Sequence, residues 1–539
     1  MTRLDCHFTW NSESVMTRWE VVVPDRLILN RLILRGALRT AGVGAIVLLA
    51  VTTIGGCAAQ PQHGLSPRPR PTKPPAMAWS IHSENQIAGT PNWRMGNLGK
   101  EHDIEGWADA SSIMSGQSVG LHVSTTSTSY TIHAVRMGWY GGIEGREIWS
   151  SEVIPGVAQP APQFIAATST VATTWPVSTT VSTVGWPPGD YLFRLDSSAG
   201  PQRYIPLQIR EETAAGKVVI VSADTTWQAY NQWGGYSLYA GSNGSYTTRS
   251  RAVSFDRPYG ISTGQGASEY MENMEPLVSL TERMGVNVDY VSDVDLDENP
   301  HVLDGARAVV LTGHDEYWSS SMRQMLIATR DGGTNLAFLG ANEGYRHIRF
   351  QASSSGVPER IEVCFKEAAQ DPLFGVNNPE VTSQWRNPPD PRPESIITGV
   401  YYQSNPVKAD MVVVDPAIWL LAGTNASSGL RLPGVVNPEY DRVDTSVPTP
   451  RPIEIITHSP VNVEGRSDYS DSAYYTVPSG AGVFAAGTIA WINSLNGVNG
   501  PESAAFVATV TANLLAAFSK GPAGLLLAAT DNVGKFYTG

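Results

Sequence analysis

The residue types best suited to chemistry gather in the segment Leu311-Thr-Gly-His-Asp-Glu-Tyr-Trp318, which begins where the apolar run 308–311 ends. His314 is suited to proton transfer near neutral pH, and Glu316 can bind a metal ion or accept a proton. In extended backbone these two side chains point to one side and Asp315 to the other. The pattern predicts a general acid/base beside a carboxylate ligand. The alternative is a solvated loop whose His and Glu only cap the next helix.

Two other apolar runs also end in polar residues. Val218-Val-Ile-Val221 is followed by 222–239, which is dense in aromatic and small residues, and the run 335–339 is followed by Gly340-Ala-Asn342. In open α/β sheets, ligand sites lie beyond the carboxyl ends of such strands. We expect Asn342 to donate a hydrogen bond to a carbonyl oxygen, as oxyanion-hole groups do. The alternative is a turn residue that follows glycine.

Two tyrosines near these strand ends are candidate metal ligands. Tyr230 lies in Trp-Gln-Ala-Tyr-Asn, and Tyr259 closes Phe-Asp-Arg-Pro-Tyr. A phenolate is a hard oxygen ligand for iron, and two phenolates with one carboxylate favour a hard trivalent ion such as Fe(III). Spacing alone leaves a second interpretation open, in which both rings only fill the core.

The elements that must position these residues alternate between strand and helix after Lys217. This alternation predicts a doubly wound, mainly parallel sheet in an α/β domain at 215–525, with an irregular Pro-rich insertion at 351–432. We expect strands at 218–221, 286–291, 308–311, 335–340, 411–414, 418–421, 453–456 and 482–487 and around Trp491, and helices at 266–284, 320–330 and 504–519.

A strand-rich segment precedes this domain. Short alternating runs at 118–123, 130–135 and 190–195 are separated by Gly, Pro and Ser clusters, which predicts an all-β sandwich at 79–211. Its aromatic residues allow two interpretations, a sugar-stacking platform or ordinary packing: Trp107, Trp139, Tyr140 and Trp149.

Composition narrows the class of protein. The chain has 539 residues, too many for one core, and 42% hydrophobic and 16% charged residues, as expected for globular domains. A formal net charge of −13 argues against nucleic acid as a partner. Three cysteines without metal-ligand spacing argue against a thiolate zinc site.

The N-terminal region has the pattern of an export signal. Basic residues from Arg31 to Arg39 precede the apolar run 41–54, which ends in Ile-Gly-Gly-Cys57. This ending resembles a bacterial lipobox, so residues 1–57 are predicted to be a signal segment with Cys57 lipidated, and 58–78 a Pro-rich tether. The alternative is an ordinary signal cut near Ala58. Met1 and Met16 are both open as start sites.

Several segments together resemble the C-terminal domain of N,N-dimethylformamidase large (β) subunits. They are Thr226-Trp-Gln-Ala-Tyr-Asn-Gln-Trp-Gly-Gly-Tyr-Ser-Leu-Tyr239, Asp256-Arg-Pro-Tyr259, Gly313-His-Asp-Glu-Tyr-Trp318, Gly340-Ala-Asn342, Gly434-Val-Val-Asn-Pro-Glu-Tyr-Asp-Arg442 and Gly480-Ala-Gly-Val-Phe-Ala-Ala-Gly-Thr-Ile-Ala-Trp491. Arg136-Met-Gly-Trp-Tyr-Gly-Gly142 is similar to the β-rich, immunoglobulin-like domain that often precedes it.

The resemblance implies a glutamine-amidotransferase-like fold and a mononuclear iron site. By that resemblance Glu316, Tyr230 and Tyr259 hold the ion, with Tyr239 as a substitute for one tyrosine. It also implies that His314 transfers protons, Asn342 orients the substrate carbonyl and Glu439 acts as general base toward water.

Together these features predict an exported, membrane-anchored, metal-dependent hydrolase of a C–N amide-type bond, located on the outer face of a bacterial cell membrane. Its partners are a small amide substrate or an envelope component, and a small partner subunit is left open. A different class is also open, namely a non-catalytic lipoprotein that keeps the fold and binds envelope glycan through the aromatic platform.

Overall fold

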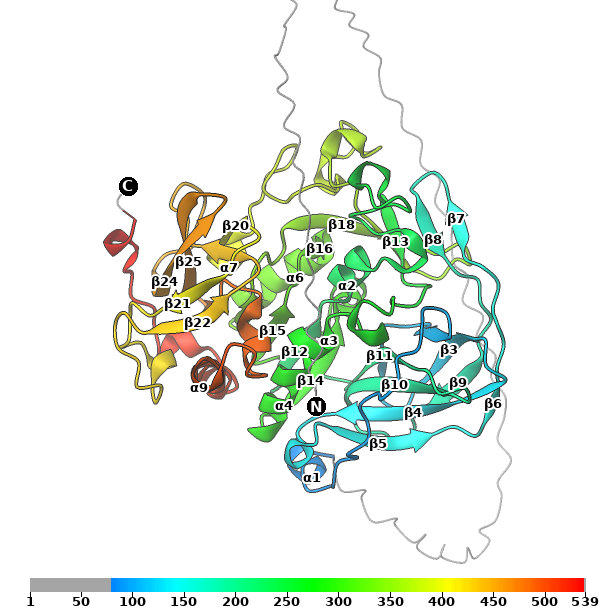
Figure 1. Ribbon diagram of the computed structural model, residues 1–539. Helices are drawn as coiled ribbons and strands as arrows, with labels where there is room; N and C mark the ends of the chain where they lie inside the picture. Colours follow the sequence, from blue (N-terminus) through cyan, green and yellow to red (C-terminus); the bar gives the residue numbers. More distant parts are fainter. Residues whose placement is uncertain (1–78, 538–539) are drawn as a thin grey trace, which may run out of the picture. The chain divides into compact units, whose positions relative to one another are not determined.

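The computed structural model describes residues 79–537, which belong to one compact unit, Pro75–Gly539 (Figure 1). The predicted signal segment at 1–57, including Cys57, and the tether at 58–78 lie outside the described residues.

The N-terminal part of the described chain consists of two mainly antiparallel sheets with one shared core, in which only β2 runs parallel to its neighbour β11. The three-stranded sheet has the order β1-β3-β9, and the larger sheet has the order β2-β11-β10-β4-β5 with β6 on β4. Alternate apolar residues of both sheets, such as Leu121, Ile132 and Phe193, are fully buried between them. The strands are β1 Ile104–Ala108, β2 Ser112–Met114, β3 Ser118–Thr125, β4 Ser129–Met137, β5 Gly145–Ser150, β6 Ile154–Pro155, β9 Thr179–Ser182, β10 Gly189–Ser197 and β11 Gln202–Arg210.

The four aromatic residues considered as a sugar platform do not form one exposed surface. Trp107 and Tyr140 are buried, and Trp107 stacks on His122 with ring centroids 3.7 Å apart. Trp139 is half-buried beside the guanidinium of Arg283. Packing is therefore the main role of these rings.

A seven-stranded sheet forms the centre of the second part, with the order β14-β12-β15-β17-β26-β25-β24 (Figure 1). The first five strands are parallel, and β25 and β24 form an antiparallel hairpin at one edge. The parallel register brings the carboxyl ends of β12, β15 and β17 to one edge of the sheet. The strands are β12 Val218–Ser222, β14 Val288–Ser292, β15 Ala308–Gly313, β17 Asn335–Gly340, β24 Ile453–Val463, β25 Arg466–Thr476 and β26 Gly482–Ala485.

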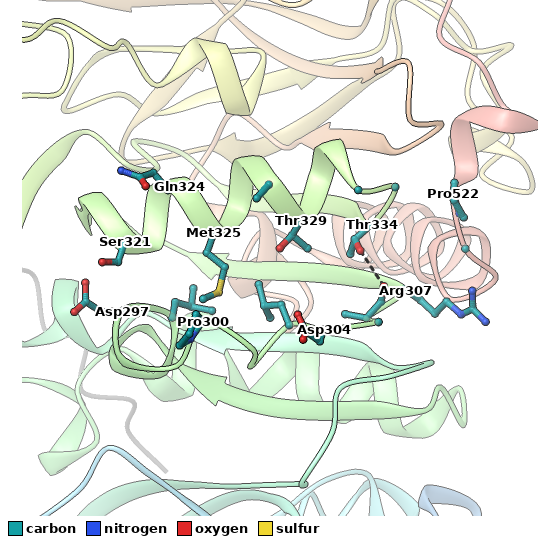
Figure 2. Close-up of a pocket in the computed structure, with 18 residues that line it drawn as sticks. Asp297, Pro300, Asp304, Arg307, Ser321, Gln324, Met325, Thr329, Thr334 and Pro522 are labelled. Carbon is teal, nitrogen blue, oxygen red and sulfur yellow. Dashed lines mark hydrogen bonds between the residues drawn. The ribbon is translucent and has the colours of Figure 1, made fainter. Parts of the chain in front are cut away.

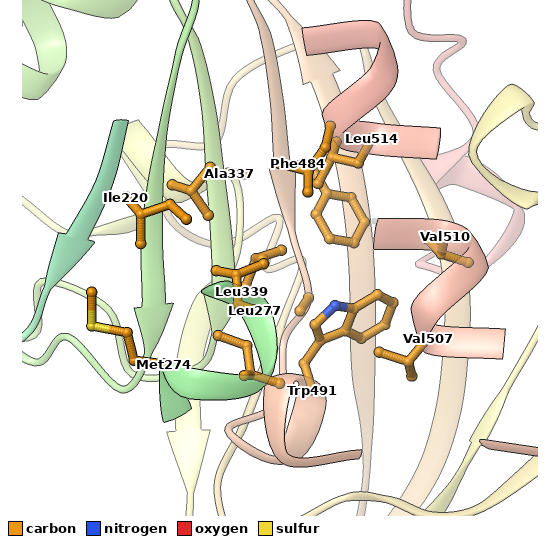
Figure 3. Close-up of a cluster of buried hydrophobic side chains, with 14 of the residues drawn as sticks. Ile220, Met274, Leu277, Ala337, Leu339, Phe484, Trp491, Val507, Val510 and Leu514 are labelled. Atoms are coloured by element: carbon orange, nitrogen blue, oxygen red, sulfur yellow. The ribbon is translucent and has the colours of Figure 1, made fainter. Parts of the chain in front are cut away.

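Both faces of this sheet are covered, which explains why its strands are continuous apolar runs. On one face Ile220 and Leu339 pack with Leu277, Trp491 and Val510 from three helices (Figure 3). On the other face the strands pack against α6. The helices are α1 Ile81–Glu84, α2 Asp224–Tyr230, α3 Tyr270–Asn273, α4 Glu275–Arg283, α5 Asp293–Glu298, α6 Ser320–Asp331, α7 Ser395–Thr398, α8 Ala490–Ser494 and α9 Pro501–Phe518.

Smaller sheets surround this centre. A four-stranded sheet has the order β13-β19-β18-β16, and three further sheets have two strands each. Their strands are β7 Gln163–Ile165, β8 Thr170–Ala172, β13 Ala252–Ser254, β16 Tyr317–Ser319, β18 Arg346–Gln351, β19 Ile361–Val363, β20 Tyr401–Ser404, β21 Ala409–Val412, β22 Arg431–Val436 and β23 Tyr440–Arg442.

The predicted fold class was a doubly wound, glutamine-amidotransferase-like α/β domain preceded by an immunoglobulin-like sandwich, and its doubly wound part is wrong. Strands in seven sheets dominate the described residues, and only α4, α6 and α9 have nine residues or more among their α-helices. The helices next to β12 and β14 are short, with 7 residues in α2 and 6 in α5. Beyond β26 the sheet continues with an antiparallel hairpin because β24 and β25 pair with each other over their whole length.

Three local predictions also need comment. Trp491 lies in α8, not in a strand, and 418–421 contains a 3₁₀ turn, Trp419–Leu421. The helix expected at 504–519 is α9, Pro501–Phe518, which is long and apolar enough to cross a membrane by length and composition alone. Its apolar side, including Val507 and Leu514, packs against the central sheet (Figure 3), which is typical of a core helix.

Candidate active site

Three side-chain oxygens form a compact triangle beyond the carboxyl ends of β12 and β15. The Tyr230 hydroxyl lies 2.8 Å from Oε2 of Glu316, the Tyr239 hydroxyl lies 2.8 Å from the same oxygen, and the two hydroxyls are 2.7 Å apart. The two phenol rings stack with centroids 4.3 Å apart. Tyr230 ends α2, Tyr239 follows a turn nine residues later, and Glu316 lies between β15 and β16.

The triangle fits the donor set of a hard metal ion. Neighbouring ligands of an octahedral ion with bonds of about 2.0 Å are about 2.8 Å apart, which matches the three observed separations. Two phenols and a carboxylate are the hard oxygen donors that suit a trivalent ion. Tyr230, Tyr239 and Glu316 therefore present a geometry and a chemistry that a single ion can use.

Cationic side chains compensate the buried charge of Glu316. Burial raises the pKa of this carboxyl, but Lys366, Arg346 and His314 outweigh burial and hold the pKa below its ordinary value. Arg346 donates from Nε to Oε1 over 3.3 Å. Nζ of Lys366 lies 3.1 Å from the centroid of the Tyr239 ring and makes no hydrogen bond, and burial followed by the charge of Arg346 lowers the pKa of this amine well below its ordinary value. Glu316 is thus ionised, with Oε2 left to face the two phenols.

The phenols of Tyr230 and Tyr239 are protonated in this arrangement. Burial, followed by the charge of Glu316, raises the pKa of both hydroxyls well above the ordinary value. Tyr239 also accepts a hydrogen bond of 2.7 Å from the hydroxyl of Tyr317. The site therefore holds protons that a bound cation would displace.

The predicted catalytic residues lie next to the triangle. His314 Nε2 is 3.6 Å from Oε2 of Glu316 and 3.5 Å from Nδ2 of Asn342. Asn342 has a φ of 63°, and its backbone N–H donates to Asp441 over 3.0 Å, which fixes the turn after β17. Glu439 accepts a 2.9 Å bond from Asn405 on Oε1.

Burial and charge set the protonation of these groups. Burial lowers the pKa of His314, but the carboxylates of Glu439, Glu269 and Glu316 outweigh it and raise the pKa above its ordinary value. Burial also raises the pKa of Glu439, and His314 opposes this shift. His314 and Glu439 therefore stabilise each other's charged forms: the carboxylate raises the pKa of the imidazole, and the imidazolium lowers the pKa of the carboxyl.

A cavity of about 370 Å³ gives access to this cluster. It is lined by Tyr230, His314 and Glu439, together with Glu269, Glu272 and Asn493 among others. Its size suits a small ligand. Because the cavity reaches the phenol of Tyr230 and the side chains of His314 and Glu439, a substrate bound in it can meet these three groups.

The structure does not bring Tyr259 to this cluster. Its ring lies edge-on to Trp227 with centroids 6.4 Å apart, and it lines a separate small cavity with Asp224 and Arg257. Arg257 donates to backbone carbonyls of 228, 231, 233 and 236, so the segment before Tyr259 supports the turn between Tyr230 and Tyr239. Tyr239, the substitute that the resemblance allowed, lies where Tyr259 was expected.

A larger cavity, about 820 Å³, lies elsewhere (Figure 2). It is lined by residues that precede β15 and β17, such as Arg307 and Thr334, and by residues of α6, such as Met325. These are the amino ends of the strands, opposite the triangle. None of the predicted site residues lines this cavity.

A second group of side chains could hold a metal ion. Ligand atoms of Glu101, His102 and Glu105 lie within 4.8 Å of one another. Glu105 already accepts a 2.8 Å bond from the Trp233 indole and lies 2.9 Å from Nδ1 of His102, while Glu101 accepts from the N–H of Ile261. These partners satisfy the carboxylates without an ion.

One comparison with known proteins identifies a family. A family model described as "N,N-dimethylformamidase beta subunit-like, C-terminal" matches residues 131–503. The chain belongs to this family. The dimethylformamidase-like match includes every residue of the triangle and its cavity, so these residues lie in the part of the chain that defines the family.

Neither of the other comparisons adds to the family match. No curated protein matches the dimethylformamidase-like chain. Among solved structures, a Paenibacillus sp. cycloisomaltooligosaccharide glucanotransferase complexed with cycloisomaltoheptaose aligns at 12% identity with a TM-score of 0.13. The alignment covers 24% of this chain and 16% of that chain.

Proposed function

We propose that this dimethylformamidase-like chain is a metal-dependent hydrolase of a C–N amide bond. The observation that carries the proposal is the triangle of Tyr230, Tyr239 and Glu316 oxygens, 2.7–2.8 Å apart, beside a cavity that also holds His314 and Glu439. We assign a single Fe(III) ion to these three ligands because the donor set is hard and anionic. When bound, such an ion supplies Lewis acidity toward a carbonyl oxygen or a water molecule.

The remaining residues have distinct roles in the proposed reaction. Asn342 donates from Nδ2 to the substrate carbonyl oxygen. Glu439 acts through Oε2, its oxygen without a hydrogen-bond partner, and takes a proton from the attacking water. His314, between Glu316 and Asn342, delivers a proton to the leaving amine nitrogen. Hydrolysis then yields a carboxylic acid and an amine.

Metal content tests the proposal directly. The full chain should be expressed with iron supplied, and iron should be quantified beside the phenolate-to-iron absorption band. We expect a single iron ion per chain and a visible band in the wild-type protein, and loss of both in Glu316→Ala. Hydrolysis of small formamides should follow the iron content. Absence of iron and of the band in the wild type would remove the proposed chemistry.

We also propose that the protein is exported and anchored to the outer face of a bacterial cell membrane through lipidated Cys57. The sequence Ile54-Gly-Gly-Cys57 after an apolar run supports this. Mass spectrometry of the membrane-extracted protein should find an N-terminal diacylated Cys57. In Cys57→Ala the mature protein should leave the membrane fraction. We propose a small amide or an envelope component as the ligand. Nucleic acid is not proposed, because the net charge of −13 would repel its phosphates.

The glycan-binding alternative gains no support in the described residues. The aromatic residues proposed for it include two buried rings, Trp107 and Tyr140. Buried rings cannot offer a face to a sugar.

A further inference from the structure

The cavity that leads to the candidate active site is acidic. Three carboxylates line it, Glu269, Glu272 and Glu439, while no Lys or Arg does, and His314 is its one basic lining group. Arg346 and Lys366, the nearest cations named above, lie against Glu316 and Tyr239 and do not line the cavity. Acidic side chains therefore outnumber basic ones in the lining by three to one.

The deepest of these carboxylates has an unused acceptor. Glu439 is only 7% exposed, yet its Oε2 accepts no hydrogen bond, while Oε1 is bonded to Asn405. The amide of Asn342 is close enough to lower the pKa of Glu439 but does not bond Oε2. Asn342 Oδ1, also buried, is a second acceptor without a partner. Buried acceptors of this kind need a donor, and a ligand with N–H groups supplies one.

The other two carboxylates lie on and next to α3. Glu269 is half-buried and accepts a 2.8 Å bond from Asn273 on Oε2. Burial raises its pKa, so an additional positive charge nearby would be favourable. Glu272 is exposed and can meet a ligand as it enters.

We propose that the substrate of this site is a small amide that carries a positive charge, an ammonium group close to the scissile C–N bond. Its ammonium lies against Glu269 and Glu272, and an N–H group donates to Oδ1 of Asn342, which leaves Oε2 of Glu439 to the attacking water. An anionic amide is repelled by the same wall, and a neutral amide gains none of the electrostatic attraction. The substrate class rests on the proposed function, while the charge selectivity of the cavity can be measured without turnover.

Binding of three matched probes tests the inference. N-(3-aminopropyl)formamide is cationic at neutral pH, N-butylformamide is its neutral counterpart, and N-formyl-β-alanine is anionic. Binding to the full chain is measured by saturation-transfer NMR and calorimetry at low salt. We expect the cationic probe to bind about tenfold more tightly than the neutral one, and the anionic probe not to bind. Added salt should reduce the preference.

Two variants locate the effect. Glu272→Gln, at an exposed position, should weaken binding of the cationic probe about two- to fivefold. The double variant Glu269→Gln/Glu272→Gln should weaken it more than tenfold, and neither variant should change binding of the neutral probe. Glu298→Gln on α5 removes an equal charge away from the cavity and should change nothing. Equal binding of cationic and neutral probes, preference for the anion, or binding of no probe would overturn the inference.

Hydrolysis separates this inference from the proposed function. If the cationic probe binds preferentially but no amide is hydrolysed by the iron-loaded protein, the proposed function fails and the cavity selectivity stands. If neutral and cationic formamides are hydrolysed with equal kcat/KM, the proposed function stands and the substrate class is wrong.

Discussion

Arg136 on β4 and Glu282 on α4 form a two-pronged ion pair whose side chains are both fully buried. Nη2 donates to Oε1 over 2.6 Å and Nη1 donates to Oε2 over 3.0 Å. The hydroxyl of Tyr290 adds a 2.9 Å bond to Oε1. The pair joins the N-terminal sheets to α4. This helix directly follows α3, the short helix whose Glu272 lines the active-site cavity.

Removing one partner of this pair should be costly. In Glu282→Gln the shape is kept, but Arg136 loses its counter-charge inside the protein. We expect the free energy of unfolding to fall by about 3–5 kcal/mol, measured by urea denaturation. Glu502→Gln, at an exposed position, should change it by less than about 0.5 kcal/mol. A loss in Glu282→Gln no larger than in this control would show that the pair contributes nothing.

Tyrosine replacements distinguish the two candidate ligands. Tyr239→Phe removes an oxygen of the triangle, so we expect the iron content and the phenolate absorption to fall sharply. Tyr259→Phe removes a hydroxyl that lies elsewhere and should leave both unchanged. Unfolding curves of the two variants provide the control for folding. The reverse ranking would restore the ligand set that the family resemblance implied.

The sequence allowed some of this site to be predicted, and the reason is local. β12, β15 and β17 are buried on both sides, so their apolar runs and the polar residues after them were visible as patterns, and His314, Glu316 and Asn342 follow from these patterns. Tyr239 could not be ranked above Tyr259, because its position depends on the turn at Gly234 and Gly235, whose φ values are 74° and 82°.

Other features needed the tertiary structure. Lys366 ends the run Ile-Glu-Val-Cys-Phe-Lys, and only the pairing of β19 with β13 and β18 brings it over Tyr239. The sequence signal that could have pointed to Lys366 is a charged residue directly after a short apolar strand. Trp491 favours strands by type, but it packs from α8 against Phe484 with ring centroids 5.6 Å apart. The β24–β25 hairpin, which decides the fold class, has no short turn signal beyond Glu464-Gly465.

The amide of Asn342 can be removed without backbone strain. Because its φ is 63°, glycine is the replacement that tolerates this conformation. We expect Asn342→Gly to lower kcat for amide hydrolysis about 10²–10³-fold, with a smaller change in KM, if Nδ2 stabilises the transition state. Iron content should stay at the wild-type level. An unchanged kcat would exclude Asn342 from the reaction.

Asp190 on β10 should make the free energy of unfolding depend on pH. Burial raises the pKa of this β10 carboxyl to about 8, and the side chain of Gln208 opposes the shift. Its unperturbed pKa is 3.8, so the folded protein binds the proton more tightly than the unfolded chain does. The stability it contributes is fully present below about pH 3.8 and is lost as pH rises through 8.

Asp190→Asn should remove this dependence. We expect the variant to gain stability over the wild type as pH rises from 5 to 9, by several kcal/mol in total. Urea unfolding at pH 5 and at pH 9 measures the difference in unfolding free energy between the variant and the wild type, called the gap below. A gap that is the same at pH 5 and pH 9 would mean that Asp190 does not titrate in this range.

Gly340 allows the carboxyl ends of β15 and β17 to approach closely. A Cβ at this position would overlap the carbonyl oxygen of Gly313 and the carboxyl of Glu343. Gly340→Ala should therefore cost about 2–4 kcal/mol and slow amide hydrolysis, because His314 and Asn342 flank this contact. Gly96→Ala, where a Cβ meets nothing within 4 Å, is the matched control. Equal stability of the two variants would contradict the close approach.

Two of the three oxygens in the triangle come from one stretch of ten residues, Tyr230 to Tyr239, and the third comes from a separate strand end. A relative that alters this single stretch would keep its sheets and helices yet lose most of its capacity to hold an ion. Once iron is found in this chain, the presence of both tyrosines in that stretch becomes a practical criterion for separating metal-binding members of the family from those that share only the architecture.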